Sequence, residues 1–224
     1  LLKKEVEAIN LIIKNKKEPV TCIIGGSKIS TKINVISNLI QNVNNIVIVG
    51  AMANNFLAYK GYKIGKSLYE KNSEKIINTI YANAKKKGCQ IIIPIDCNVS
   101  KTFEGPSMSK KQSDIGEDEI ILDIGPESIK NIENIIDKSN TVLWNGPAGY
   151  FENKNFATGT NSIAKKISDN TSDQSLISIL GGGDTVTAIN KINKKLSFTH
   201  LSTAGGAFLE YLEGKDLPGL SVLK

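Results

Sequence analysis

Six short apolar segments alternate with longer stretches of helical periodicity along most of this chain. The apolar segments are rich in Ile and Val and lack polar alternation, which is typical of strands buried on both faces. They cover residues 20–24, 45–49, 90–94, 141–144, 176–180 and 198–202. The alternation predicts an α/β fold: a three-layer Rossmann-like domain with a mostly parallel six-stranded sheet and helices on both faces.

Helical periodicity lies between most of the apolar segments. The expected helices cover roughly 28–41, 52–60, 73–87, 126–138, 159–169, 184–195 and 204–213. The stretch 95–125 differs, because it is polar and contains the sequence GPSMSKKQSD, so it predicts loops or an edge hairpin. Because no Pro/Ser-rich linker or internal repeat interrupts the pattern, we expect one domain.

Small residues follow five of the six predicted strands. The turns are GGSK (25–28), GA (50–51), NGPAG (145–149), GGGD (181–184) and TAGG (203–206). In a parallel sheet these turns share the edge at the carboxyl ends of the strands, where open α/β sheets bind ligands. Glycine lets backbone N–H groups approach a ligand closely, and helix N-termini attract anions. Any one turn is explained by steric shortening alone, but five together predict a site for a nucleotide or another phosphate.

Two lysines stand four residues apart at the start of the first predicted helix. At that spacing Lys28 and Lys32 lie on one helix face, where two ammonium groups repel each other unless an anion lies between them. The alternative is a pair of solvent-exposed lysines. Neither common nucleotide signature is present: GYKIGKS (61–67) is one residue short of a P-loop, and GGGDTV (181–186) lacks the third glycine of the dinucleotide pattern.

Polar residues in two of the glycine turns are further candidates. Asn145 follows a buried strand and can donate to phosphate oxygens, although Asn-Gly is also a common turn. Glu152 can accept hydrogen bonds from ribose hydroxyls. Asp184 is either a helix N-cap or a ligand of Mg²⁺ brought by phosphates, with Thr185 facing those phosphates.

The formal net charge is +6, and all 28 basic residues are lysine. Nucleic-acid readers favour arginine, and these lysines cluster at the ends of predicted helices, so we expect solvated helix ends and no nucleic-acid partner. No segment is long and apolar enough to span a membrane. The three cysteines have no metal-site spacing and indicate a reducing compartment. We therefore expect a cytoplasmic monomer without a membrane partner.

Seven segments together resemble phosphoglycerate kinase. They are GGSKISTKI (25–33), VGAMANNFL (49–57), GKSLYE (65–70), LDIGPES (122–128), TVLWNGPAGYFE (141–152), GGGDTVTAI (181–189) and HLSTAGGAFLEYLEGKDLPGL (200–220). The resemblance runs from about Leu1 to the end and corresponds to the family's C-terminal, nucleotide-binding half. It implies an interdomain-type helix at 1–17 and the nucleotide-binding domain at 18–224. The N-terminal half, which holds 3-phosphoglycerate with arginines and a histidine, is absent from the chain.

The resemblance implies transfer of the acyl phosphate of 1,3-bisphosphoglycerate to MgADP, which gives ATP and 3-phosphoglycerate. Lys28 would steady the migrating phosphoryl group, and Lys32 would bind nucleotide phosphates. Asp184 would bind Mg²⁺ in a phosphate turn. The resemblance also places Gly182, Gly183 and Thr185 in the phosphate turn, Asn145 beside the phosphates and Glu152 at the ribose. The residues that would border the adenosine are Gly25, Gly26, Gly50 and Gly125. Gly205 and Gly206 would form a helix N-terminus that faces the transferring phosphate.

Three positions depart from the family's usual residues. Ala51 and Ala204 replace frequent glycines, and Thr31 replaces a frequent Asp. Neither alanine removes a charged group, so we expect these two replacements to affect nucleotide affinity rather than function.

An alternative hypothesis is that the chain is not an enzyme but a stand-alone, non-catalytic nucleotide-binding module.

Overall fold

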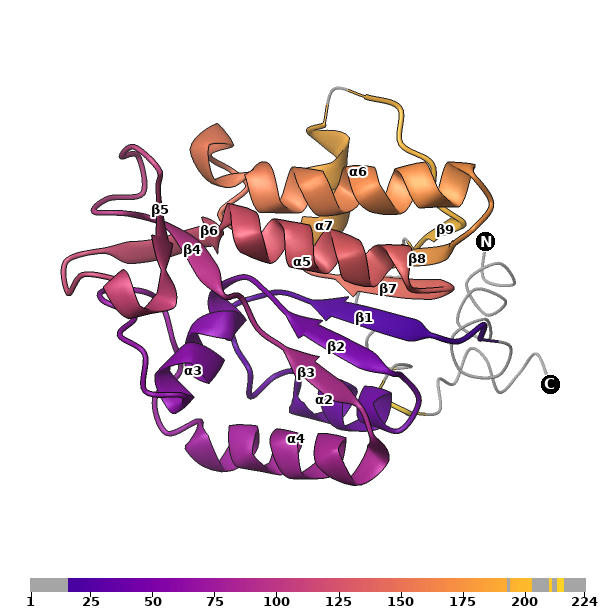
Figure 1. Ribbon diagram of the computed structural model, residues 1–224, viewed down its shortest axis with the longest axis horizontal. Coiled ribbons are helices and arrows are strands. Elements are labelled where there is room, and N and C mark those ends of the chain that lie inside the picture. Colours follow the sequence, from indigo (N-terminus) through magenta and orange to yellow (C-terminus); the bar gives the residue numbers. More distant parts are fainter. Residues whose placement is uncertain (1–15, 193, 203–209, 211–212, 216–224) are drawn as a thin grey trace.

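The computed structural model describes residues 16–192, 194–202, 210 and 213–215 (Figure 1). Its main feature is a six-stranded, wholly parallel sheet in the order β3-β2-β1-β7-β8-β9. The strands are β1 (Val20–Ile24), β2 (Asn45–Ile48), β3 (Gln90–Ile92), β7 (Thr141–Asn145), β8 (Ile177–Gly181) and β9 (His200–Leu201). Each of the six apolar segments therefore forms the strand that the sequence predicts.

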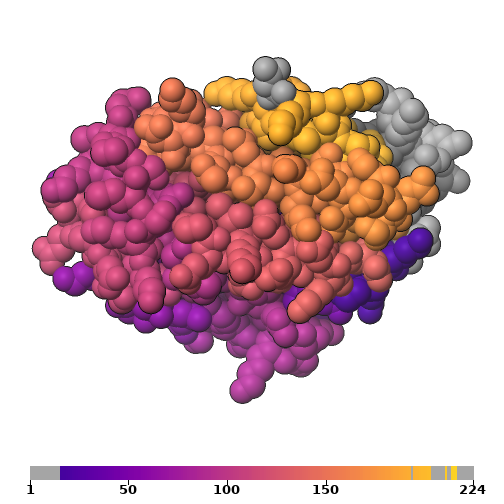
Figure 2. Space-filling model, turned by 45° about the horizontal axis from the view of Figure 1, so that its top comes forward, coloured from indigo at the N-terminus to yellow at the C-terminus, as the bar shows by residue number. Residues whose placement is uncertain are grey.

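Helices cover both faces of this sheet, as Figure 1 shows. One face carries α2 (Ile33–Ile40), α3 (Ala51–Tyr59) and α4 (Glu74–Lys87), and the other carries α5 (Pro126–Asp137), α6 (Thr158–Ser172) and α7 (Gly183–Asn190). Side chains alternate across a strand. Cys22 and Ile24 accordingly pack under α2 and α3, while Ile23 packs with Trp144 under α5 and α6. In Figure 2 the surfaces of α5 and α6 lie side by side across the middle of the molecule.

The stretch 95–125 is more ordered than the sequence predicts. It holds a three-stranded antiparallel sheet of β5 (Met108–Lys111), β4 (Asp96–Ser100) and β6 (Ile120–Ile124), in that order, and a short 3-10 helix at Gln112–Asp114. The expected hairpin is the β4–β5 pair, but the third strand was not expected. The polarity of β4 is misleading, because Asp96 and Asn98 are buried and bonded: Asp96 accepts from the backbone of Ser128 at 2.7 Å, and Asn98 donates to the carbonyl of Ile124 at 3.1 Å.

Several predictions fall outside the described residues. They are most of the helix expected at 1–17, nearly all of the helix expected at 204–213, and the turn with Gly205 and Gly206. Within the described part of the chain, no helix combines the length and the apolar character needed to cross a membrane. Cys22, Cys89 and Cys97 are buried free thiols.

Candidate functional site

The order of strands in the parallel sheet reverses between β1 and β7. Chain order runs outward from β1 to β3 on one side and from β7 to β9 on the other. Ligands of open α/β sheets bind outside the carboxyl ends of the strands at such a reversal. The two strands are joined there by a hydrogen bond of 2.8 Å from the N–H of Gly25 to the carbonyl of Asn145.

A polar cavity of about 290 Å³ opens at this point. Its walls come from the turns that follow β1, β7 and β8, three of the five turns that the sequence singles out. The lining residues are Gly25, Gly26, Ser27, Lys28, Thr31, Lys32, Asn145, Gly146, Gly182, Gly183, Asp184 and Thr185. The fold therefore brings most of the predicted phosphate-binding residues to one place.

Lys32 is the half-buried cation of this cavity. Its ammonium donates to Oδ1 of Asn145, whose amide nitrogen donates to the carbonyl of Gly181 at 3.0 Å. Burial lowers the pKa of Lys32 to about 8, against an opposing attraction from the carboxylate of Asp184. A bound anion would raise this pKa again by stabilising the charged ammonium, so the cavity favours an anionic ligand.

The helix expected over 28–41 begins only at Ile33. Lys28 and Lys32 therefore precede α2, and a loop, not a helix face, brings them to the same cavity. The loop is held by hydrogen bonds: Thr31 donates to the carbonyl of Lys28 at 3.0 Å, and Ser30 donates its N–H to Glu70 at 3.0 Å. The hydrogen bonds from Ser30 lower the pKa of the Glu70 carboxyl, and the nearby charge of Lys28 adds to this effect.

The first turn of α7 forms the opposite wall. Gly182 has φ +98°, a left-handed conformation that glycine adopts without strain, and the helix begins at Gly183. The free N–H groups of such a first turn attract anions. Asp184 is exposed at the cavity rim. Thr185 is fully buried, and its hydroxyl accepts from the N–H of Gly146 at 2.7 Å, which ties α7 to the turn after β7.

Glycine is required where two backbone segments meet under the cavity. A Cβ atom on Gly25 would lie 2.3 Å from the carbonyl oxygen of Pro147, and one on Gly50 would lie 3.0 Å from the same atom. The N–H of Gly50 donates to the carbonyl of Ala148 at 3.1 Å. The turn after β7 thus rests directly on the turns after β1 and β2.

The single tryptophan lies under this same turn. Trp144 is fully buried at the end of β7, and its indole N–H donates to the carbonyl of Gly146 at 2.7 Å. The indole thereby fixes the backbone of a residue that lines the polar cavity.

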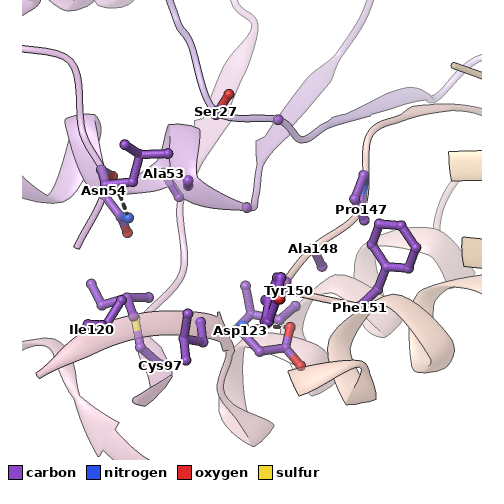
Figure 3. A pocket seen from close by; sticks show the side chains of 18 of the residues that line it. Ser27, Ala53, Asn54, Cys97, Ile120, Asp123, Pro147, Ala148, Tyr150 and Phe151 are labelled. Carbon is purple, nitrogen blue, oxygen red and sulfur yellow. Dashed lines mark hydrogen bonds between the residues drawn. The ribbon is translucent and has the colours of Figure 1, made fainter. Parts of the chain in front are cut away.

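A second, mostly apolar cavity of about 340 Å³ adjoins the polar one. It lies between α3, the strand β6 and the turn after β7, and Figure 3 shows Asn54, Ile120, Asp123, Ala148 and Phe151 around it. The two cavities share three lining residues, Gly26, Ser27 and Asp184. Glu152, Gly50 and Ala51 also line the apolar cavity. An apolar cavity beside a polar one lined by two lysines matches the polarity of a nucleotide.

Asp123 is a buried carboxyl in the wall of the apolar cavity. It accepts backbone N–H groups of Ile124 at 2.9 Å and of Gly159, at the start of α6, at 2.8 Å. Burial raises its pKa to about 7, although these hydrogen bonds act in the opposite direction. Asp123, Glu70 and Trp144 have no role predicted from the sequence. They lie inside the segments 122–128, 65–70 and 141–152 that resemble the family.

The family model described as phosphoglycerate kinase matches residues 1–215. The chain belongs to the phosphoglycerate kinase family. Phosphoglycerate kinase of Francisella tularensis subsp. novicida is 44% identical over 226 residues, which cover 100% of this chain and 57% of that protein. Phosphoglycerate kinase of Zymomonas mobilis is 42% identical over 225 residues, with the same shares covered.

Solved phosphoglycerate kinases have the same fold as this chain. The structure from Coxiella burnetii has a TM-score of 0.94 at 36% sequence identity, and the one from Pyrococcus horikoshii has 0.82 at 27%. Each match covers 100% of this chain; it covers 58% of the Coxiella burnetii chain and 56% of the Pyrococcus horikoshii chain. The chain therefore spans a little over half the length of the phosphoglycerate kinases it matches.

Three residues that the family resemblance assigned to the site are not placed at either cavity. Gly125 is the N-cap of α5 and lines neither cavity; a Cβ atom there would lie 2.3 Å from the carboxyl group of Asp96. Its neighbour Ile124 does line the apolar cavity. Gly205 and Gly206 lie outside the described residues. The other predicted residues of the phosphoglycerate kinase site line one cavity or both.

Proposed function

We propose that this chain is the nucleotide-binding part of a phosphoglycerate kinase that transfers a phosphoryl group reversibly between 1,3-bisphosphoglycerate and MgADP. The products are 3-phosphoglycerate and MgATP. The observation that carries the proposal is the pair of adjoining cavities, one apolar and one lined by lysines and a helix N-terminus. ADP lies with its base in the apolar cavity, its phosphates in the polar cavity and its ribose beside Glu152.

Each polar group then has a separate task at the phosphates. Lys32 and Asn145 bind the nucleotide phosphates, together with the free N–H groups of the first turn of α7. Lys28, which is exposed at the outer side of the same cavity, steadies the phosphoryl group during transfer. Phosphoryl transfer depends mainly on positioning and charge stabilisation, so these donors suffice without a covalent intermediate on the protein.

Asp184 is the residue that fits a magnesium ion. Its carboxylate lies at the rim shared by the two cavities, and Mg²⁺ in nucleotide sites typically takes one or two carboxylates with phosphate oxygens and water. In the described ranges no three Cys, His, Asp or Glu side chains gather into a metal site. The ion would therefore arrive with the nucleotide, and it would neutralise phosphate charge beside Asp184.

Calorimetric titration with ADP, with and without Mg²⁺, tests the proposed function. We expect binding in both conditions and tighter binding with Mg²⁺. In Asp184→Asn the gain from Mg²⁺ should shrink by about tenfold, because a neutral amide attracts the ion less, while binding without the ion should be unchanged or slightly tighter. Asp173→Asn, at the exposed end of α6 away from both cavities, is the control. Absence of ADP binding in both conditions would refute the proposal.

The affinity for ADP should depend on the protonation of Lys32. Because the free ammonium loses its proton near pH 8 and the phosphates require the charged form, affinity should fall about fivefold between pH 8 and pH 9. Lys32→Arg stays charged over this range, so its affinity should remain nearly constant. Titrations of both proteins at pH 7, 8 and 9 measure this difference; equal slopes would contradict the assigned role of Lys32.

A further inference from the structure

The loop that carries Lys28 is bonded to α3 on its N-terminal side. This loop follows β1 and ends where α2 begins, at Ile33. The N–H of Met52, in the first turn of α3, donates to the carbonyl of Gly26 at 2.7 Å. Gly26 lies two residues before Lys28, so the backbone just ahead of this lysine is attached to α3.

Glu70 holds the loop on the other side of Lys28. Its carboxylate accepts the N–H of Ser30, two residues after the lysine, at 3.0 Å. Hydrogen bonds from the hydroxyl and the N–H of Ser30 lower the pKa of this carboxyl, and the N–H of Ile29 and the charge of Lys28 act in the same direction. The charged carboxylate therefore prevails at neutral pH, and it binds the loop more strongly than a neutral acceptor would.

Glu70 is itself fixed by α3. Its backbone N–H donates at 2.8 Å to Oδ1 of Asn55, and the hydroxyl of Ser73 donates to the same oxygen at 3.3 Å. Asn55 is only 1% exposed, and its amide nitrogen donates to the carbonyl of Met52 at 3.2 Å. Both attachments of the loop thus lead back to one helix.

We propose that Glu70 is a positioning residue for phosphoryl transfer, which acts by holding Lys28 at the outer side of the polar cavity. The inference rests on the proposed function, in which Lys28 steadies the phosphoryl group. Lys28 is exposed, and it lies between the two attached points of the loop, Gly26 and Ser30. A displacement of about 1 Å at a reacting centre can lower a rate by about a hundredfold. Loss of the Glu70 carboxylate would release one of the two attachments.

Calorimetric titrations with ADP and ATP, both with Mg²⁺, separate this role from a general weakening of the site. ATP carries the phosphoryl group that is transferred, whereas ADP ends one phosphate short of it. We expect Glu70→Ala to weaken ATP about fivefold and to change the affinity for ADP by less than about twofold. A ratio of the two affinities that is unchanged, or that shifts toward ATP, would overturn the role of Glu70 and leave the proposed function intact. Failure of the unaltered chain to bind ADP would refute the proposed function itself.

Two further variants show whether Glu70 acts through its hydrogen bonds. Glu70→Gln keeps an oxygen that can accept from Ser30, so it should restore most of the ATP affinity that Glu70→Ala loses. Glu74→Ala is the matched control, because Glu74 is exposed in the first turn of α4 and lines neither cavity; both affinities should stay unchanged. An ATP affinity of Glu70→Gln no higher than that of Glu70→Ala would contradict a role through these hydrogen bonds.

A double-mutant cycle shows whether the effect passes through Lys28. Lys28→Ala removes a charge-assisted contact to the third phosphate, so it should weaken ATP about tenfold and leave ADP nearly unchanged. Without the ammonium the position of the loop no longer matters, so Glu70→Ala should cost nothing more when it is added to Lys28→Ala. Additive losses, about fiftyfold in the double variant, would overturn the proposal, because Glu70 would then act independently of Lys28.

Discussion

A polypeptide of these 224 residues should bind ADP but transfer phosphoryl groups at less than about a thousandth of the rate of a full-length phosphoglycerate kinase. Holding two reactants in line is worth many orders of magnitude in rate. The chain spans 57% of the length of its curated relatives, and we propose that the remaining part of such a protein holds 3-phosphoglycerate against the nucleotide. Nucleotide binding would thus persist where catalysis fails.

A coupled assay for ATP formation measures this difference. The same preparation is first titrated with ADP, so that a lack of turnover is not confused with a lack of folding. Addition of the N-terminal domain of a relative as a separate polypeptide should raise the rate, since it supplies the second binding surface. Turnover by the 224 residues alone at rates near those of the full-length enzyme would contradict the proposal that a second domain must hold 3-phosphoglycerate.

Gly25→Ala should lower the free energy of unfolding by about 3 kcal/mol, because one added carbon overpacks a backbone contact. The new Cβ atom would lie 2.3 Å from the carbonyl oxygen of Pro147 and 2.7 Å from the backbone of Gly146. Neither neighbour is a side chain that can turn away. The melting temperature should fall by roughly 10 °C for a domain of this size.

Gly183→Ala is the matched control for this substitution. It adds the same atom at the first position of α7, where no atom lies within 4 Å of the new carbon. Its melting temperature should stay within about 2 °C of the unaltered protein, or rise slightly from the better helix propensity of alanine. Thermal unfolding followed by circular dichroism compares the two variants; equal losses would show that the contact with Pro147 does not matter.

The sequence predicts the sheet better than the loops, for a physical reason. Strands such as 20–24 and 141–145 are buried on both faces, so their composition alone identifies them. Composition does not identify the strand β4, because its polar residues Asp96 and Asn98 are buried through hydrogen bonds with residues about 30 positions away. Similarly, Lys28 and Lys32 keep a helical spacing although the loop around them, held by Glu70, is not helical.

The candidate site, too, contains some residues that the sequence identifies and others that it does not. Glycines, lysines and Asp184 are visible in the sequence because their residue types suit phosphates at the end of a strand. Glu70 is not, because the sequence gives no sign that its carboxylate accepts the N–H of Ser30, 40 positions away. Only the folded chain, with the backbone of Glu70 held by Asn55, brings the two together.

The single tryptophan gives the protein a built-in optical probe. All indole emission comes from Trp144, which is shielded from water and bonded to the backbone of the cavity wall at Gly146. A change of intensity or wavelength during a titration can thus be assigned to one turn of the chain without an added label. The same signal also reports unfolding, because that indole becomes hydrated only when the sheet opens.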